Sequence, residues 1–238
     1  MPVPSGIGFY SAHFKAEAYD YFSGLKEDYV GLIDNDIICI NSIPLCLTNL
    51  AKSQTALHYD ITEQIFPAHG QERVLADKKL VDPKTTFGLW SGGEFIMGPP
   101  AFFKRLYQEI NLFQDNYFKV YKQLRHTSDE VLTSVGVENL INSASYPITD
   151  AGKLKIIGRH WSAKTLHVQN KLEYYRDCFL LHLPSDKHFL ASLADKNIPN
   201  DQIMQHYEQH LKTIQPSYYS RLFGEKTVSS VKRLIGKA

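Results

Sequence analysis

Two aspartates stand one residue apart at the end of an apolar run near the start of the chain. The segment YVGLIDNDIIC contains Asp34 and Asp36, directly after VGLI. Side chains at positions i and i+2 of an extended chain lie on the same side. Two carboxylates placed in this way can share one divalent cation, and such a cation commonly holds a diphosphate. The same pattern also fits a solvated polar turn.

A second group of reactive side chains follows the apolar segment DCFLL. His182 and Lys187 belong to the sequence HLPSDK, so an imidazole and an ammonium group stand on one tight turn. Histidine is a good ligand for a transition metal such as Mn²⁺, and lysine binds phosphate as a point charge. The alternative is an ordinary buried histidine before a helix that Ser185 or Asp186 caps.

The segment WSGGEF offers a third candidate. Gly92 and Gly93 between apolar residues allow a ligand to approach the backbone closely, and Glu94 would then face the same cavity. The alternative is a β-bulge or a hairpin turn with an exposed glutamate.

Acidic residues at a helix start form the fourth candidate. Asp129 and Glu130 follow Ser128, and either carboxylate could orient or deprotonate an acceptor hydroxyl. Acidic residues in a first helical turn are also common for electrostatic reasons alone.

These candidates must be positioned by alternating strands and helices. The periodicity predicts strands at about 29–33, in QTALHYDI, in LKIIG and in DCFLLHL, and a strand, a glycine turn and a strand in FGLWSGGEFIMG. Residues 60–86 contain Pro67, Gly70 and Pro83, so they predict loops with one short helix. The fold class is therefore α/β, with a mixed, mostly parallel sheet flanked by helices.

Several helices are predicted around this sheet. They cover 11–27, a short segment within INSIPLCLTNLAKS, PPAFFKRLYQEINLFQD, TSDEVLTSVGVENLI, 185–193 and 199–214. Proline suits the first turn of the PPAFF helix, and Thr127 or Ser128 suits the N-cap of the next. The apolar stripe predicted for the PPAFF helix consists of Phe102, Phe103, Leu106, Ile110 and Phe113.

Length and composition restrict the class of protein. The chain has 238 residues, 43% of them hydrophobic, and a formal net charge of +1. This size suits one large domain, and near neutrality gives no case for a nucleic-acid partner. Cys39, Cys46 and Cys178 form no CxxC pair, which favours free thiols in a reducing compartment. No secretory signal or membrane span is evident, so a cytoplasmic location is expected.

Two regions are expected along the chain: a domain over 1–215 and a basic helical tail over 216–238. The tail has five basic residues and one acidic residue between 221 and 238. Its apolar residues fit one helical face: Val228, Val231, Leu234 and Ile235. Such a helix can make peripheral contact with an anionic membrane on its inner face, or it can pack on the domain with its basic face in solvent.

Taken in order, the LIDND, GGEF and LHLPSDK segments resemble the GT-A glycosyltransferases, most closely bacterial nucleotide-sugar-dependent enzymes that build surface polysaccharide. The resemblance covers roughly residues 10–192. It implies a GT-A-like fold and transfer of a sugar from a nucleoside diphosphate donor, with a UDP-sugar expected. It also implies Mn²⁺ or Mg²⁺ as cofactor and a glycan or lipid-linked acceptor.

The resemblance assigns roles to the metal and phosphate residues. Asp36 would bind the metal directly, and Asp34 would reach it through water or contact the ribose or sugar of the donor. His182 would be the third protein ligand. Lys187 would stabilise the leaving phosphate.

The same resemblance assigns roles around the sugar. Gly92, Gly93 and Glu94 would line the sugar and acceptor pocket, and Asp129 or Glu130 would lie near the acceptor, as a base if the enzyme inverts. The family usually places a nucleotide-binding half before its DxD motif, whereas 33 residues precede Asp34 here. An abbreviated nucleotide-binding half is therefore expected.

Two alternatives stay open. A non-catalytic GT-A-like domain would bind a glycan or a partner in a pocket without convergent acids. A phosphatase of the HAD type would use Asp34 as a lone nucleophile without His182 nearby, but Ile37 and Ile38 follow the DxD and no GDxxxD appears.

Overall fold

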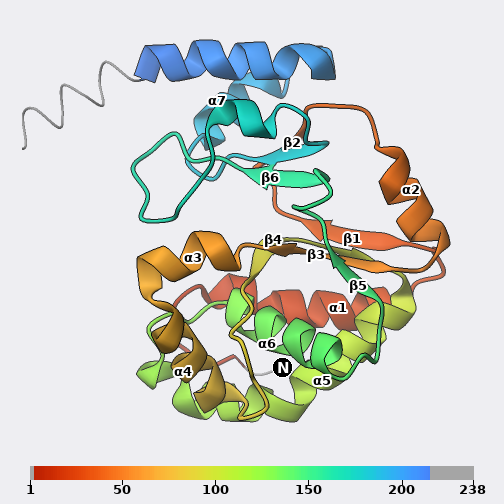
Figure 1. The fold of residues 1–238 in the computed structure, drawn as a ribbon, viewed down its shortest axis with the longest axis vertical. Coiled ribbons are helices and arrows are strands. Elements are labelled where there is room, and N and C mark those ends of the chain that lie inside the picture. The colour runs from red at the N-terminus through yellow and green to blue at the C-terminus, as the bar shows by residue number, and fades with distance from the viewer. Residues whose placement is uncertain (1–2, 215–238) are drawn as a thin grey trace, which may run out of the picture.

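The strands within the described part of the chain form two mixed sheets, one above the other in Figure 1. The computed structural model describes residues 3–214, so the predicted basic tail at 216–238 lies outside the described residues. The first sheet has the order β1-β4-β3-β5, formed by Val30–Ile33, Ser91–Gly98, Ala56–Asp60 and Ile148–Asp150. The second has the order β2-β7-β6, formed by Ile37–Cys39, Leu180–His182 and Ile157–Arg159.

The prediction of a mostly parallel sheet is wrong. Strand β4 pairs antiparallel with β1 and β3, and β2 pairs antiparallel with β7. Only β3 with β5 and β6 with β7 run parallel among the described strands. The α/β class and the mixed character of the sheets are confirmed, since helices flank both sheets.

A helical layer covers the first sheet on the side away from the second (Figure 1). It contains α1, α4, α5 and α6, formed by Lys15–Ser23, Gln71–Val81, Pro100–Val120 and Asp129–Asn142. The predicted apolar stripe of α5 is confirmed, because all five of its side chains are buried in the core that this layer shares with the sheet. The Oγ of Ser128 accepts a hydrogen bond from the amide of Glu130, which confirms the N-cap of α6.

Shorter elements complete the fold. Helices α2, α3 and α7 span Leu45–Lys52, Thr62–His69 and Lys187–Leu193, and residues 200–214 are also helical. Short 3₁₀ turns span Tyr10–Phe14, Tyr121–Gln123 and Leu172–Tyr175. Helix α7 and residues 200–214 cover the second sheet, where a separate apolar core contains Ile40, Leu181, Phe189 and Tyr207.

Three local predictions need correction. Residues 60–86 contain two helices, α3 and α4, because Pro67 is accommodated inside α3 and Gly70, at φ 83°, joins the two. The predicted glycine turn at Gly92 and Gly93 does not exist, since β4 continues through both residues. The helix predicted over 11–27 begins with a 3₁₀ turn, and α1 itself ends at Ser23.

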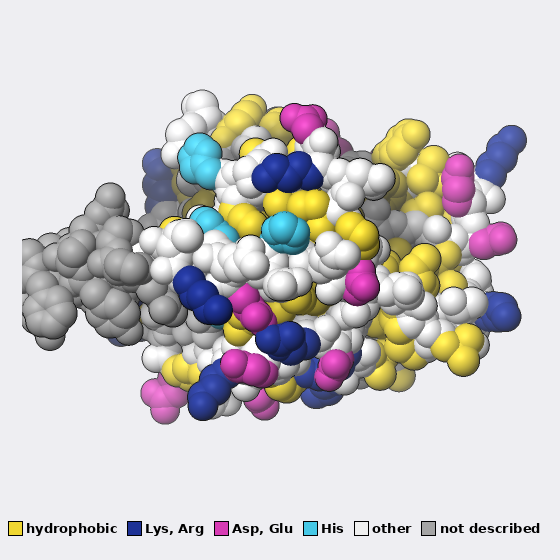
Figure 2. All heavy atoms as spheres, turned by 90° about the horizontal axis from the view of Figure 1, so that it is seen from above, with side chains coloured by type: hydrophobic (Ala, Val, Ile, Leu, Met, Phe, Trp, Pro, Cys, Tyr) yellow, Lys and Arg dark blue, Asp and Glu magenta, His cyan; other side chains and the backbone are white. Residues whose placement is uncertain are grey.

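The surface at the α7 end of the molecule carries no extended area of one charge sign among its described side chains. Figure 2, which looks down on this end, shows acidic, basic and histidine side chains interspersed with apolar ones. Within residues 3–214, no helix combines the length and the apolar character needed to cross a membrane.

Candidate metal and phosphate site

The link between β1 and β2 carries both aspartates from one sheet to the other. The amide of Asp34 still donates to the carbonyl of Glu94 on β4, at 3.0 Å. Two residues later, the carbonyl of Asp36 accepts from the amide of Leu183, which follows β7. The β2–β7 register then pairs Ile37 with His182. The DxD segment is therefore fixed at the junction of the two sheets.

This junction brings the predicted metal ligands together. One ligand atom from each of Asp34, Asp36 and His182 lies within 4.8 Å of the others. Asp36 and His182 are buried, whereas Asp34 is partly exposed. The cluster is the only such group of His, Cys, Asp or Glu side chains in the described part of the chain.

The donor set fits a divalent cation. Asp36 Oδ1 lies 3.0 Å from Nε2 of His182, but no donor among the described residues meets this buried oxygen at a hydrogen-bonding angle. His182 is the group that faces this oxygen, so a divalent cation could replace the proton on Nε2 and bind both side chains. Two carboxylates and one imidazole suit Mn²⁺, and Mg²⁺ with additional water ligands.

The carboxylates around His182 determine the charge of its ring. Burial alone would lower the pKa of His182, but the carboxylates of Asp36 and Glu94 outweigh it and raise this pKa to about 9. The protonated ring thus places a positive charge between two acids. His182 next to Asp36, together with Lys187, lowers the pKa of Asp36 to about 2 despite its burial.

Lys187 lies where a phosphate group could reach it. Its Nζ is 3.3 Å from Oδ2 of Asp36, and its side chain is 67% exposed at the first turn of α7. The carboxylate anchors the ammonium group on one side and leaves the rest of it open to solvent. Lys187 therefore lies beside the candidate metal ligands, as predicted.

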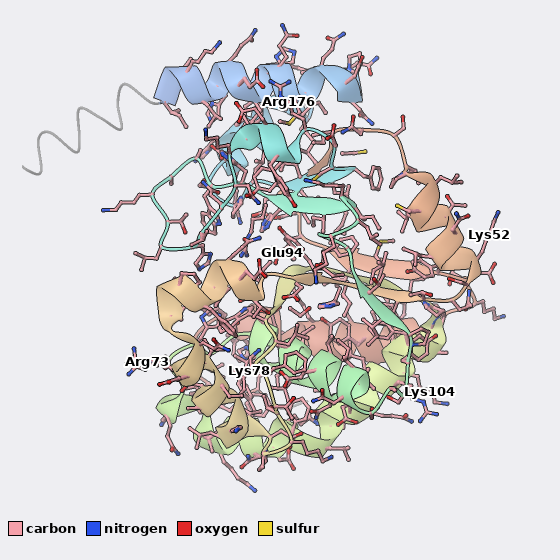
Figure 3. The ribbon with its side chains drawn as sticks, viewed as in Figure 1. Lys52, Arg73, Lys78, Glu94, Lys104 and Arg176 are labelled. Atoms are coloured by element: carbon pink, nitrogen blue, oxygen red, sulfur yellow. The ribbon has the colours of Figure 1, made fainter. Side chains whose placement is uncertain are left out.

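Glu94 lies between the two sheets (Figure 3) and contacts His182 of the cluster. Its Oε1 is 3.2 Å from Nδ1 of His182 and 3.3 Å from NH1 of Arg159, which is buried on β6. Burial opposes the ionisation of Glu94, but Arg159 and then His182 outweigh it and lower its pKa to about 2. Glu94 orients His182 and is fully enclosed, so an exposed glutamate on a hairpin turn is excluded.

The paired glycines make room for the acidic side chains. A Cβ atom on Gly92 would overlap the carboxylate of Glu94. A Cβ atom on Gly93 would come within 2.5 Å of Oδ2 of Asp129 and 3.0 Å of Cγ of Glu130. Gly92 thus makes room for the side chain of Glu94, and Gly93 allows the start of α6 to approach β4 closely.

Lys15 joins the DxD segment to the start of α6. Its Nζ donates to Oδ1 of Asp34 at 2.8 Å and to the carbonyl of Gly93 at 2.7 Å, and lies 3.2 Å from Oδ2 of Asp129. Burial alone would lower the pKa of Lys15, but Asp129 and Asp34 outweigh it and raise this pKa. Burial raises the pKa of Asp129 to about 6, although Lys15 opposes the shift.

The carboxylate of Glu130 contacts three neighbouring groups of the protein. Its Oε2 accepts from the indole nitrogen of Trp90 at 2.9 Å and lies 3.3 Å from Nε2 of His126, and its Oε1 accepts from the amide of Gly93 at 3.4 Å. Burial would raise the pKa of Glu130, but His126 and Arg159 together outweigh it and lower this pKa. Glu130 therefore links the start of α6 to β4 and the residue before it. Asp129 is instead connected to the metal ligand Asp34, because Lys15 contacts both carboxylates.

Sequence reasoning missed two residues of this site, Lys15 and Arg159. Lys15 has no local signal, because it is the only lysine of α1 and a single lysine on a helix is usually a solvent-exposed residue. Arg159 did have one, since it closely follows the apolar residues Ile156 and Ile157, and a charge at the end of a buried strand needs a partner.

Comparisons with protein-family models, with curated proteins and with solved structures found no match to this chain.

Proposed function

We propose that this chain is a metal-dependent glycosyltransferase that moves a sugar from a nucleoside diphosphate donor to a glycan or lipid-linked acceptor. The observation that carries the proposal is the convergence of Asp34, Asp36 and His182, with Lys187 beside Asp36. A HAD-type phosphatase would have Asp34 without His182 nearby, so this convergence favours the transferase. A binding domain without convergent acids is disfavoured for the same reason.

Different residues would bind the metal ion and the phosphate of the donor. Mn²⁺ or Mg²⁺, held by Asp36, His182 and Asp34, would supply charge neutralisation for the departing diphosphate. Lys187 would contribute a second positive charge to the leaving phosphate, where negative charge develops. Glu94 would keep the His182 ring in place through its Nδ1 contact.

Asp129 is the better of the two candidate bases. Its pKa of about 6 keeps it largely ionised at neutral pH and basic enough to accept a proton from a hydroxyl in the transition state. Glu130 accepts hydrogen bonds from Trp90 and Gly93, so we assign it a supporting role.

Calorimetric titration with UDP and GDP, with and without MnCl₂, tests the proposal. We expect nucleotide binding that requires Mn²⁺ and weakens at least tenfold in Asp36→Asn, which keeps the size of the side chain. Asp28→Asn is the matched control, because Asp28 is exposed and lies outside the cluster. Sugar-nucleotides are then screened by mass spectrometry for release of the nucleoside diphosphate. Absence of Mn²⁺-dependent binding of any nucleoside diphosphate would refute the proposal.

A further inference from the structure

Residues 160–171 form a loop without helix or strand between β6 and the 3₁₀ turn at Leu172–Tyr175. In Figure 1 this loop extends from β6 toward α3. The amide of Val168 donates to the carbonyl of Gln64 on α3, at 3.1 Å. The side chains of Leu166 and Val168 are 75% and 53% exposed, so their burial contributes little to holding the loop on α3. A change at one of its few remaining contacts can therefore release the loop.

Three histidines from separate parts of the fold meet where the loop lies on α3. His167 lies in the loop, His69 ends α3, and His126 lies shortly before α6. The ring centre of His69 is 5.9 Å from that of His167 and 6.3 Å from that of His126. Nδ1 of His167 and Nε2 of His126 are buried without a hydrogen-bond partner among residues 3–214. Protons on the rings of this histidine cluster would place like charges side by side.

The groups around the histidine cluster favour neutral imidazole rings. Burial, then Arg159 and the other two histidines, lower the pKa of His167 to about 4. The carboxylate of Glu130 opposes this shift without outweighing it. Burial and then His126 also lower the pKa of His69. The docked loop thus binds a proton less readily than a loop released into solvent would.

We propose that residues 160–171 act as a pH-dependent latch on α3, docked while His167 is neutral and released when His167 binds a proton. Release would relieve the repulsion between the protonated ring, Arg159 and the neighbouring imidazoles. It would also open a cavity of about 250 Å³, because Val168 and the two residues after it form one wall and Gln64 forms part of another. The latch does not depend on the proposed activity, since the candidate metal ligands are not members of the histidine cluster.

The expected size of the effect follows from the linkage between proton binding and docking. His167 titrates at about 4 in the docked loop and at its ordinary value of 6.5 in the released loop, so docking is almost independent of pH above about pH 7. At lower pH the released loop takes up the proton first. The docking equilibrium constant should therefore fall by roughly thirtyfold between pH 8 and pH 5.

Amide hydrogen exchange of the full-length chain tests the latch. Exchange of the peptide that contains Val168 is followed by mass spectrometry at pH 8 and pH 5 and corrected for the chemical exchange rate at each pH. We expect its protection to fall roughly thirtyfold at pH 5, while a peptide from α5 keeps its protection. In His167→Phe, which keeps an aromatic ring but cannot bind a proton, protection should change less than about threefold. His188→Phe is the matched control and should retain the full pH effect, because His188 is exposed on α7.

Three outcomes would overturn the proposal: no protection of the loop at pH 8, a fall at pH 5 no greater than that in α5, or an unchanged fall in His167→Phe. If that variant does not fold, His167→Gln replaces it, since glutamine is also neutral at both pH values. An NMR titration of the ring protons of His167 is an independent check, because its midpoint should lie clearly below the ordinary value of 6.5. A midpoint at or above that value would also contradict the latch.

Discussion

At the scale of single residues, the site consists of acidic side chains that are paired with basic side chains of the same protein. Lys15 joins Asp34 to Asp129, and His182 joins Asp36 to Glu94. Each buried acid therefore has a cationic neighbour. Removing one cation should leave an unpaired charge whose cost depends on pH, since a carboxylate can become neutral.

Lys15→Met tests this dependence. Asp129 has a pKa of about 6 in the folded protein, above its usual value of 3.8, so its ionisation disfavours the folded state as pH rises from about 4 to 6. Without Lys15 this pKa rises further, and the penalty extends to higher pH. We expect the variant to lose about 2 to 3 kcal/mol of unfolding free energy at pH 8 and less than about 1 kcal/mol at pH 5.

Urea unfolding at both pH values measures this difference, with Lys26→Met as the control because Lys26 is exposed. The control should change stability by no more than about 0.5 kcal/mol at either pH. An equal loss for Lys15→Met at pH 5 and pH 8 would show that packing, rather than the charge of Asp129, accounts for the effect.

Some of these residues could be predicted from the local sequence, whereas others depend on tertiary packing. Asp34, Asp36 and His182 each stand next to an apolar strand, but their convergence was expected only from the resemblance to GT-A glycosyltransferases. The antiparallel pairing of β2 with β7, which brings Asp36 to His182, was not predicted. No local sequence pattern distinguishes Lys15 from a solvent-exposed lysine. Its three partners, Asp34, Gly93 and Asp129, come close only because α1 packs near β4 and α6. The inward direction of Glu94 also depends on the second sheet, which local sequence does not specify.

At the scale of elements, the errors have identifiable causes. Helix α4 buries Val74, Lys78 and Val81, so a lysine occupies its apolar face and hides the helical periodicity. Burial lowers the pKa of Lys78 to about 7, and its Nζ lies 5.0 Å from the ring centre of Trp90. Strand direction was mispredicted because short apolar strands do not encode whether their neighbours run parallel or antiparallel.

Gly93→Ala tests the close approach of α6 to β4. The new methyl group would lie within 2.5 Å of Asp129 Oδ2 and must displace either the helix start or the strand. We expect a loss of about 1 to 3 kcal/mol of unfolding free energy, as for other overpacked sites. Chemical denaturation monitored by tryptophan fluorescence is a suitable measurement, because Trp90 donates a hydrogen bond to Glu130 at this contact.

Gly24→Ala is the matched control for that substitution. Gly24 ends α1 with a φ of −98°, and a Cβ atom there would meet only the carbonyl oxygen of Tyr21, at 3.7 Å. Its effect should stay within about 0.5 kcal/mol. Equal stabilities for the two alanine variants would mean that α6 and β4 can separate at no cost.

At the scale of the whole molecule, the site is also the place where the two sheets are joined. Asp34 belongs to the end of the first sheet, Asp36 to the start of the second, and Glu94 reaches from β4 to Arg159 and His182. The two sheets share an apolar core, in which Leu57 and Phe95 of the first sheet cluster with Ile157 and Leu180 of the second. The buried charge pairs at this junction should add to that apolar cohesion. Folding and metal binding are thereby expected to depend on the same contacts.

A double-mutant cycle on Glu94 and Arg159 tests this dependence. Both side chains are buried, at 2% and 4% exposure, so Arg159→Met leaves a carboxylate with only His182 as a cationic partner. Breaking a buried pair in this way should cost about 3 to 5 kcal/mol, whereas adding Glu94→Gln should restore at least about 2 kcal/mol of that loss. Hydrogen exchange in Arg159→Met should accelerate in β6 and β7 more than in α5.

The exposed pair Arg176–Glu208 provides the control cycle, since its side chains are 51% and 30% exposed. Its coupling energy should stay below about 1 kcal/mol, because water screens such pairs. A coupling of similar size in both cycles would mean that burial at the sheet junction adds nothing. Additive losses for Glu94 and Arg159, with uniform exchange across the molecule, would mean that apolar packing alone holds the sheets together and that Glu94 serves only to orient His182.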